Sequence, residues 1–146
     1  MTWKWANLPV PIPHVAGIVL GAVLQVAFEH TMFRSPGWAR GAGIVLLAGD
    51  VGLVVSSVLT AGDTKVDSPD RPVTTGPYSR IRNPMYVAWG LIHIGTGLVT
   101  NGWWLIAALP VVFAFIHFDV ICEERFLEET FGDRYLQYKR RVRRYF

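Results

Sequence analysis

The chain has a single cysteine and one long stretch without any charged side chain. Cys122 on its own cannot form an internal disulfide and lacks the partner cysteines of a metal site, so no metal site is expected. Between Pro84 and Phe118 there is no Asp, Glu, Lys or Arg. A helix on the surface of a soluble protein needs a polar face, so this stretch is not typical of one.

Apolar sequence dominates instead. Hydrophobic residues make up 51% of the 146 residues, six residues are Trp, and the mean hydropathy is +0.31. A helix that crosses a bilayer needs about 20 mostly apolar residues. Four stretches meet this requirement, so we predict one all-α membrane domain over residues 1–146 with four transmembrane helices. The predicted spans are residues 14–30, 38–60, 84–100 and 103–122.

The cations predict the orientation of these spans. With four spans, the N-terminus, the 61–83 loop and the residues after the fourth span share one side. That side holds 12 of the 14 Lys and Arg residues (one, four and seven), and Arg34 and Arg40 lie on the other. The positive-inside rule therefore places both termini in the cytoplasm, with the chain in the plasma membrane if it is bacterial.

Small residues predict the packing faces of the first two spans. Gly17 and Gly21, four residues apart, let another helix approach closely. In the second span we predict that the packing face is formed by Gly41, Gly49, Gly52 and Ser56, which fall near one side of a helix.

One carboxylate lies in the middle of the second predicted span. A charged side chain inside a bilayer is costly, so Asp50 is expected to face the other helices, either protonated or paired. Two readings stay open: a buried Asp that is hydrogen-bonded to a neighbouring helix, or a functional group.

Turn formers and aromatic residues gather before the third predicted span. Gly76-Pro77 marks a turn. Asn83 suits the N-cap of a helix and Pro84 its first position. A helix start exposes unpaired N–H groups and a partial positive charge, which suit an anionic or hydrogen-bonding ligand. Residues 61–83 form a long polar loop, of a length that is usually functional or disordered.

A predicted hairpin brings two polar clusters together. Asn101-Gly102 is a tight turn, so the third and fourth spans are antiparallel. The start of the third span at Asn83 then lies level with Glu123 and Glu124 at the end of the fourth. From the residues alone, the two carboxylates are either a solvated, salt-bridged helix end or part of a site.

The last residues, 133–145, are predicted to form an amphipathic helix at the membrane interface. Apolar residues recur at helical spacing opposite a cluster of Lys and Arg, as in helices that lie on anionic membranes. A nucleic-acid-binding tail is the rival reading, but the aromatic face favours the membrane, so no nucleic acid is expected. The apolar positions are Leu127, Phe131, Tyr135, Tyr138, Val142 and Tyr145.

In this order and spacing, the motifs resemble the isoprenylcysteine carboxyl methyltransferase family. The phosphatidylethanolamine N-methyltransferases, which share the Asn-Pro-Met-Tyr run, are similar too. The resemblance covers roughly residues 60–145. It rests on Gly76-Pro77-Tyr78, Arg82-Asn83-Pro84-Met85-Tyr86, Glu123-Glu124, Phe131-Gly132, Tyr135, Tyr138 and Arg141.

The resemblance implies a cytoplasmic S-adenosylmethionine site that opens laterally to lipid, with residues 61–83 as a cofactor loop. It implies methyl transfer to a lipophilic or membrane-embedded acceptor, such as a lipid amine, a thiol or a carboxylate. Carboxylates and aromatic faces suit the sulfonium and ammonium groups of the cofactor, and cations or free N–H groups suit its carboxylate. The implied cofactor-binding residues are Val73, Tyr78, Arg82, Asn83, Pro84, Met85, Tyr86, Glu123 and Glu124.

Two positions depart from the pattern of the carboxyl methyltransferases. Those proteins have His at the position of Asn83. They also place an Arg, which handles the substrate carboxylate, at the position of Asp119. An anion at this substrate position argues against a carboxylate acceptor and favours an amine or a neutral group.

Two histidines lie inside the predicted spans. At 1.5 Å per residue, His93 and His117 lie about 14 and 9 Å into the membrane, within reach of each other. They are either packing residues or candidate substrate residues, with His117 or Glu124 as the candidate catalytic group. The alternative function is a small membrane haem protein that uses His93 and His117, or His30, as axial ligands in a four-helix bundle. A non-enzymatic packing subunit is a third reading.

Overall fold

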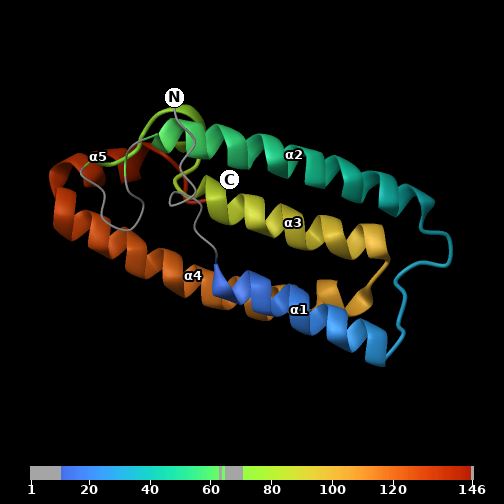
Figure 1. Cartoon of the computed structure of the whole chain (residues 1–146). Helices are drawn as coiled ribbons and strands as arrows, with labels where there is room; N and C mark the ends of the chain where they lie inside the picture. Colours follow the sequence, from blue (N-terminus) through green and yellow to red (C-terminus); the bar gives the residue numbers. More distant parts are fainter. Residues whose placement is uncertain (1–10, 63, 65–70, 146) are drawn as a thin grey trace.

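The computed structural model describes residues 11–62, 64 and 71–145 (Figure 1). This part of the chain is helical and contains no strand beyond two isolated bridges, which confirms the all-α class. The predicted charged part of the 61–83 loop lies mostly outside the described residues, as does Lys4. The elements are α1 (Ile12–Ala27), α2 (Gly37–Ala61), the short 3₁₀ helix η2 (Gly76–Ser79), α3 (Pro84–Thr100), α4 (Trp103–Phe131) and α5 (Asp133–Arg141).

Two of the described helices, α2 and α4, are long and apolar enough to cross a membrane. In the most apolar 18-residue window of each, only 22% of the residues are buried inside the protein. Large apolar side chains therefore face outward, among them Val45, which is 70% exposed, and Phe118, which is 67% exposed. Such faces need an apolar environment. Helices α1 and α3 have 16 and 17 residues, so the four-span count stays a prediction.

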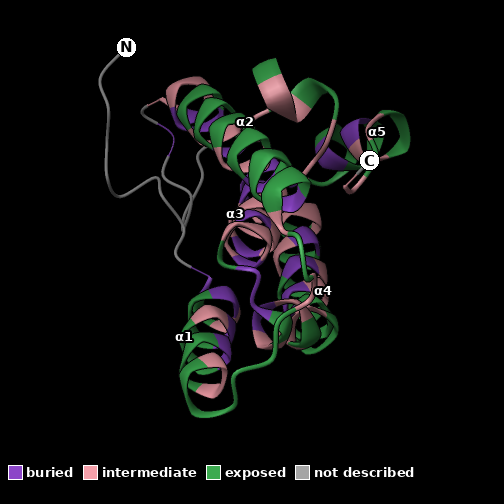
Figure 2. Cartoon of the chain, turned by 90° about the vertical axis from the view of Figure 1, so that its right-hand side faces the viewer, coloured by how far each residue is buried: buried purple, intermediate pink, exposed green. Residues whose placement is uncertain are grey.

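The α3–α4 hairpin forms the middle of the arrangement. Helix α2 packs against α3, and α1 packs against α4 (Figures 1 and 2). The consecutive helices α1 and α2 therefore lie at opposite ends of the arrangement. The turn between α3 and α4 forms as predicted, with Asn101 in the left-handed region at φ 54°. Its side-chain amide donates to the carbonyl of Phe33 at 2.9 Å, so the α1–α2 connection is bound to this turn.

Glycines on α1 allow the close approach that the sequence predicts. A Cβ at Gly17 would lie 2.4 Å from Cγ2 of Val112, and one at Gly21 would lie 3.0 Å from the Cα of Leu105, both on α4. The prediction for α2 is wrong. Its predicted face is exposed, and Cβ atoms at Gly41, Gly49 and Gly52 would have nothing within 4 Å. The glycine that meets α3 is Gly43, because the buried face of α2 is the one that also carries Ala39, Asp50, Ser57 and Ala61.

Replacing Gly17 by Leu is expected to destabilise the protein. The new side chain overlaps Val112, whose β-branched side chain is stiff, and overpacking of this kind costs about 1–3 kcal/mol. Thermal unfolding in detergent measures the effect as a lower Tm. Gly49→Leu is the matched control, since it places the same side chain in open space on α2. Equal Tm values for the two variants would contradict the packing of α1 on α4.

Asp50 faces the other helices, as predicted, and is only 5% exposed. Within the described residues its Oδ1 has no hydrogen-bond partner, and neither has Oγ of Ser57, two turns further along α2. The hydrogen bond to a neighbouring helix, which was one of the two interpretations of Asp50, is therefore not seen for its Oδ1.

The C-terminal segment differs from the predicted interfacial helix. Helix α5 ends at Arg141, and the backbone continues extended at Val142, so that Arg143 forms an isolated bridge with Ile81, just before α3. Because of this bridge, residues 142–145 are called the C-terminal strand. Tyr135 and Tyr138 are 2% and 7% exposed, so their predicted contact with lipid is wrong. They face the protein, and the hydroxyl of Tyr138 donates to the carbonyl of Tyr78 in η2 at 2.7 Å. That α5 lies at the membrane interface stays a prediction.

Candidate functional site

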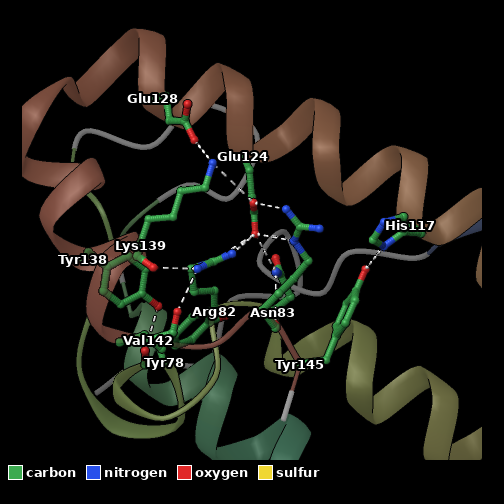
Figure 3. Close-up of polar contacts among 11 residues, drawn as sticks. Tyr78, Arg82, Asn83, His117, Glu124, Glu128, Tyr138, Lys139, Val142 and Tyr145 are labelled. Atoms are coloured by element: carbon green, nitrogen blue, oxygen red, sulfur yellow. Dashed lines mark hydrogen bonds and ion pairs between the residues drawn. The ribbon is translucent and has the colours of Figure 1, made fainter.

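Glu124 is the centre of a buried ion network at the end of α4 (Figure 3). Its side chain is 2% exposed. Arg82 donates to Oε1 from Nε at 3.0 Å, and Arg144 binds both oxygens, from Nε at 3.1 Å and from Nη2 at 2.9 Å. Nζ of Lys139 lies 3.9 Å from Oε2. Three cations, from the loop before α3, from α5 and from the C-terminal strand, thus converge on one carboxylate.

The cations keep Glu124 ionised. It lies beyond Asp119, where the apolar part of α4 ends. Burial by itself raises the pKa of a carboxyl group, but hydrogen bonds from Arg144 and the charge of Arg82 outweigh it. The pKa of Glu124 is therefore below its ordinary value. This carboxylate is therefore paired with cations of the protein itself.

The start of α3 is tied to the C-terminal strand. Nη1 of Arg82 donates to the carbonyls of Lys139 at 2.9 Å and Val142 at 2.7 Å. Pro84 occupies the first turn, as predicted, and Asn83 takes the N-cap position. The amide of Asn83 makes no capping bond; it donates to Oε1 of Glu124 at 3.4 Å and to the carbonyl of Arg144 at 3.3 Å. Asn83 therefore joins the ion network.

A polar cavity of about 580 Å³, counting its open mouth, lies beside this network. Glu123 faces it, whereas Glu124 does not, because consecutive helical residues point about 100° apart. Burial, with a smaller effect of Glu123, raises the pKa of Tyr78 to about 12, so its hydroxyl stays protonated. The cavity is lined by Ala61, Thr64, Arg71, Pro72, Val73, Tyr78, Arg82, Asn83, Glu123, Leu127, Tyr135 and Tyr138.

An apolar groove of about 910 Å³ opens between α3 and α4. Among the described residues that line it there is no Asp, Glu, Lys or Arg. Tyr86, whose side chain hydrogen-bonds to Glu123, belongs to this groove. The polar cavity and the apolar groove therefore share a wall at Tyr86 and Glu123. The groove is lined by His14, Tyr86, Val87, Gly90, Leu91, Ile94, Leu109, Pro110, Phe113, Ile116 and Tyr145.

The sequence-predicted cofactor residues thus fall into four groups. Five of them line the polar cavity together, as their order in the sequence implied. Tyr86 lines the groove, and Glu124 holds the ion network. Pro84 and Met85 are buried in the first turn of α3 and line neither space. The five in the cavity are Val73, Tyr78, Arg82, Asn83 and Glu123.

The two histidines make separate contacts. His93 is fully buried; its Nε2 lies 3.0 Å from the carbonyl of Leu105 and its Nδ1 lies 3.4 Å from Nδ1 of His14. Nδ1 of His117 lies 3.1 Å from the hydroxyl of Tyr145. The expected approach of His93 to His117 is wrong, because one is eight residues before Asn101 and the other sixteen after it, a difference of about 12 Å along the hairpin. Both nitrogens of His93 are engaged, which disfavours it as a haem ligand.

The tethered C-terminal strand was missed from the sequence. The Arg and Lys residues of α5 and of this strand were assigned to a membrane surface, whereas Arg144 of the strand and Lys139 of α5 contact Glu124. A buried carboxylate needs cationic partners, so the Glu123-Glu124 pair was the available signal. Asp119, a predicted substrate residue, is exposed on α4 and lines neither the cavity nor the groove.

The residues of the polar cavity fit S-adenosylmethionine. Glu123 supplies an anion for the positively charged groups of the cofactor, and three tyrosines supply aromatic faces. Arg71 offers a cation for its carboxylate. The chemistry of this donor set is the basis of the fit.

Comparison with known proteins identifies a family. Residues 38–134 match the profile described as phospholipid methyltransferase, which is more than half of the chain. The matched region contains α2, α3 and α4, and it includes Asn83, Tyr86 and both glutamates.

Curated relatives carry methyltransferase names. The chain is 35% identical over 78 residues to methanethiol S-methyltransferase 1 of Bradyrhizobium diazoefficiens, which is 53% of this chain and 27% of that protein. It is 32% identical over 136 residues to protein-S-isoprenylcysteine O-methyltransferase of Xenopus laevis, 84% of this chain and 46% of that protein. It is 28% identical over 141 residues to an Arabidopsis thaliana protein-S-isoprenylcysteine O-methyltransferase B, 88% of this chain and 71% of that one. The chain therefore spans less than half the length of two of these three relatives.

Proposed function

Because the chain belongs to the phospholipid methyltransferase family, we propose that it transfers a methyl group from S-adenosylmethionine to a lipophilic acceptor. The observation that carries the proposal is the shared wall between a polar cavity and an apolar groove, where Tyr86 hydrogen-bonds to Glu123. When bound, the cofactor supplies a methyl group on a positively charged sulfur.

In this proposal the polar cavity binds the cofactor and the apolar groove binds the acceptor. On the polar side, Glu123 and the aromatic face of Tyr78 hold the positive charge of the cofactor, and Arg71 binds its carboxylate. Glu124 has a positioning role, since its network fixes Arg82 and Asn83 at the cavity. On the apolar side, the groove orients the acceptor and excludes water, and such positioning supplies much of the rate in a bimolecular transfer.

The membrane placement follows from the outward apolar faces. We place α1, α2, α3 and α4 across the bilayer, although α1 and α3 are short, because a lipid-exposed helix can be matched by local thinning of the bilayer. The end that holds α5 and the loop before α3 then faces the cytoplasm, with both termini on that side, as the cation distribution favours. In this placement the groove between α3 and α4 opens toward lipid, which suits an acceptor that arrives from the membrane.

The acceptor is a lipophilic amine, thiol or carboxylate, the classes that the resemblance implies. The relatives are named for S-methylation of methanethiol and O-methylation of isoprenylcysteine, which supports a thiol or a carboxylate as the acceptor group. The uncharged lining of the groove supports an acceptor that is apolar over most of its length.

A methyl-transfer assay tests the function. Purified protein in lipid nanodiscs is incubated with S-adenosylmethionine that carries a radiolabelled methyl group, together with extracted membrane lipids, long-chain amines and long-chain thiols. We expect label in at least one lipophilic product and cofactor binding by calorimetry without any acceptor. Absence of cofactor binding would overturn the proposal, and a Soret band in the visible spectrum would favour the haem alternative.

A further inference from the structure

A polar pair at the edge of the groove has no role in the proposed function. The hydroxyl of Tyr145 lies 3.1 Å from Nδ1 of His117, and the two side chains point toward each other from the C-terminal strand and from α4 (Figure 3). Tyr145 lines the groove and packs, like Tyr86, against the cluster of Val112, Ile116 and Val120. One member of the pair, Tyr145, therefore borders the groove, as does Tyr86.

The surrounding contacts hold this pair in place. Arg144, the residue before Tyr145, binds both oxygens of Glu124 and accepts a hydrogen bond from Asn83 on its carbonyl. On the other side, the ring of Phe113 stacks on His117, with centroids 6.1 Å apart and planes at 20°. The hydroxyl and the imidazole are thus held together before any ligand arrives, which is the arrangement that acid–base groups need.

The lining of the groove narrows the acceptor class. A carboxylate acceptor requires a cation to bind it and loses no proton, but no Lys or Arg is among the described residues of the groove. A neutral thiol or amine needs no cation in the groove. Its attacking atom carries a hydrogen that must leave when the new bond forms, and an apolar groove offers little water to accept it.

We infer that Tyr145 and His117 form a proton relay for a lipophilic thiol or amine acceptor, an inference that rests on the proposed function. In the tautomer with Nδ1 unprotonated, the Tyr145 hydroxyl donates to His117. The S–H or N–H bond of the acceptor breaks, and that electron pair forms the bond to the methyl carbon. The methyl–sulfur bond of the sulfonium breaks with its pair staying on sulfur. The acceptor proton moves to Oη of Tyr145, whose own proton moves to Nδ1 of His117 and then to water.

A measurement without cofactor tests the contact between acceptor and Tyr145. 1-Octanethiol is added to the protein in detergent, and the S–H infrared band is recorded after subtraction of the band of Cys122 in the protein alone. A hydrogen bond to Oη shifts this band to lower frequency. We expect the shift in wild type and in His30→Gln, a histidine control at the far end of the bundle, and its loss in Tyr145→Phe. An identical band in wild type and Tyr145→Phe overturns the relay.

A kinetic comparison tests proton transfer itself. With 1-octanethiol, Tyr145→Phe and His117→Gln are expected to lower kcat about 100-fold or more, the usual size of acid–base catalysis, with KM unchanged. With 4-nitrobenzenethiol, which is already ionised at neutral pH, the same variants are expected to stay within about threefold of wild type, since no proton has to leave. Calorimetric affinity for S-adenosylmethionine checks that the variants are folded.

The outcomes separate the two proposals. If the two variants lose kcat equally with both thiols while their affinity for the cofactor is unchanged, the pair has a purely structural role and the relay is overturned. A wild-type protein that binds no cofactor contradicts the proposed function, while the infrared band still decides whether Tyr145 binds a thiol.

Discussion

Glu123→Gln is expected to weaken the binding of S-adenosylmethionine by about 10- to 150-fold, because a hydrogen bond to a charged group contributes about 1.5–3 kcal/mol. Glu123 is the carboxylate that lines the polar cavity, and Gln keeps its shape while removing its charge. Isothermal titration calorimetry on protein in detergent measures the effect. Glu124 is bound by three cations and does not line the cavity, whereas Glu123 does, so the substitution is made at Glu123.

Two further variants sharpen this result. Glu129→Gln removes a carboxylate from the exposed side of the same helix and is expected to leave the affinity within about twofold, since exposed charges contribute little. Tyr86→Phe removes the hydrogen bond to Glu123 but no residue from the cavity lining, so a loss of less than about tenfold is expected. If wild type and Glu123→Gln bind S-adenosylmethionine with equal affinity, the cavity is not the cofactor site.

Glu124→Gln is expected to destabilise the protein by about 3–5 kcal/mol, because it leaves cations buried without their counter-charge. The largest cost is expected at Arg82, because its side chain is only 8% exposed and water cannot replace the lost carboxylate. The C-terminal strand is held by the same network through Arg144, so it should detach first. Thermal unfolding in detergent gives the loss of stability, and trypsin should cleave after Arg140 and Arg141 faster than in wild type.

Glu128→Gln is the matched control for this second variant. It also removes a carboxylate that contacts Lys139, but its side chain is 28% exposed, and partly exposed pairs contribute about 0–1 kcal/mol. A Glu124→Gln variant that is as stable and as resistant to trypsin as Glu128→Gln would show that the network does not hold the strand.

Local signals in the sequence predicted part of the lining of the polar cavity. Tyr78, Asn83 and Glu123 were assigned to one cavity from their motifs, and they line it together. The prediction could not separate Glu123 from Glu124, because adjacent residues of a helix differ only in the direction they face. Likewise, it could not find that Tyr145 returns to His117, because contacts between distant segments leave no periodic pattern.

The sequence by itself determined the helices and the turns between them, because apolar runs, Pro84 and the Asn101-Gly102 turn act over a few residues each. Only the tertiary structure decided which face of each helix is inside. Glycines lie on several sides of α2, and packing against α3 selected Gly43, while Gly41, Gly49 and Gly52 stay outward. The rotation of α4 turned Glu124 toward three cations and Glu123 toward the cavity, since burying an ion is favourable only where its partners converge.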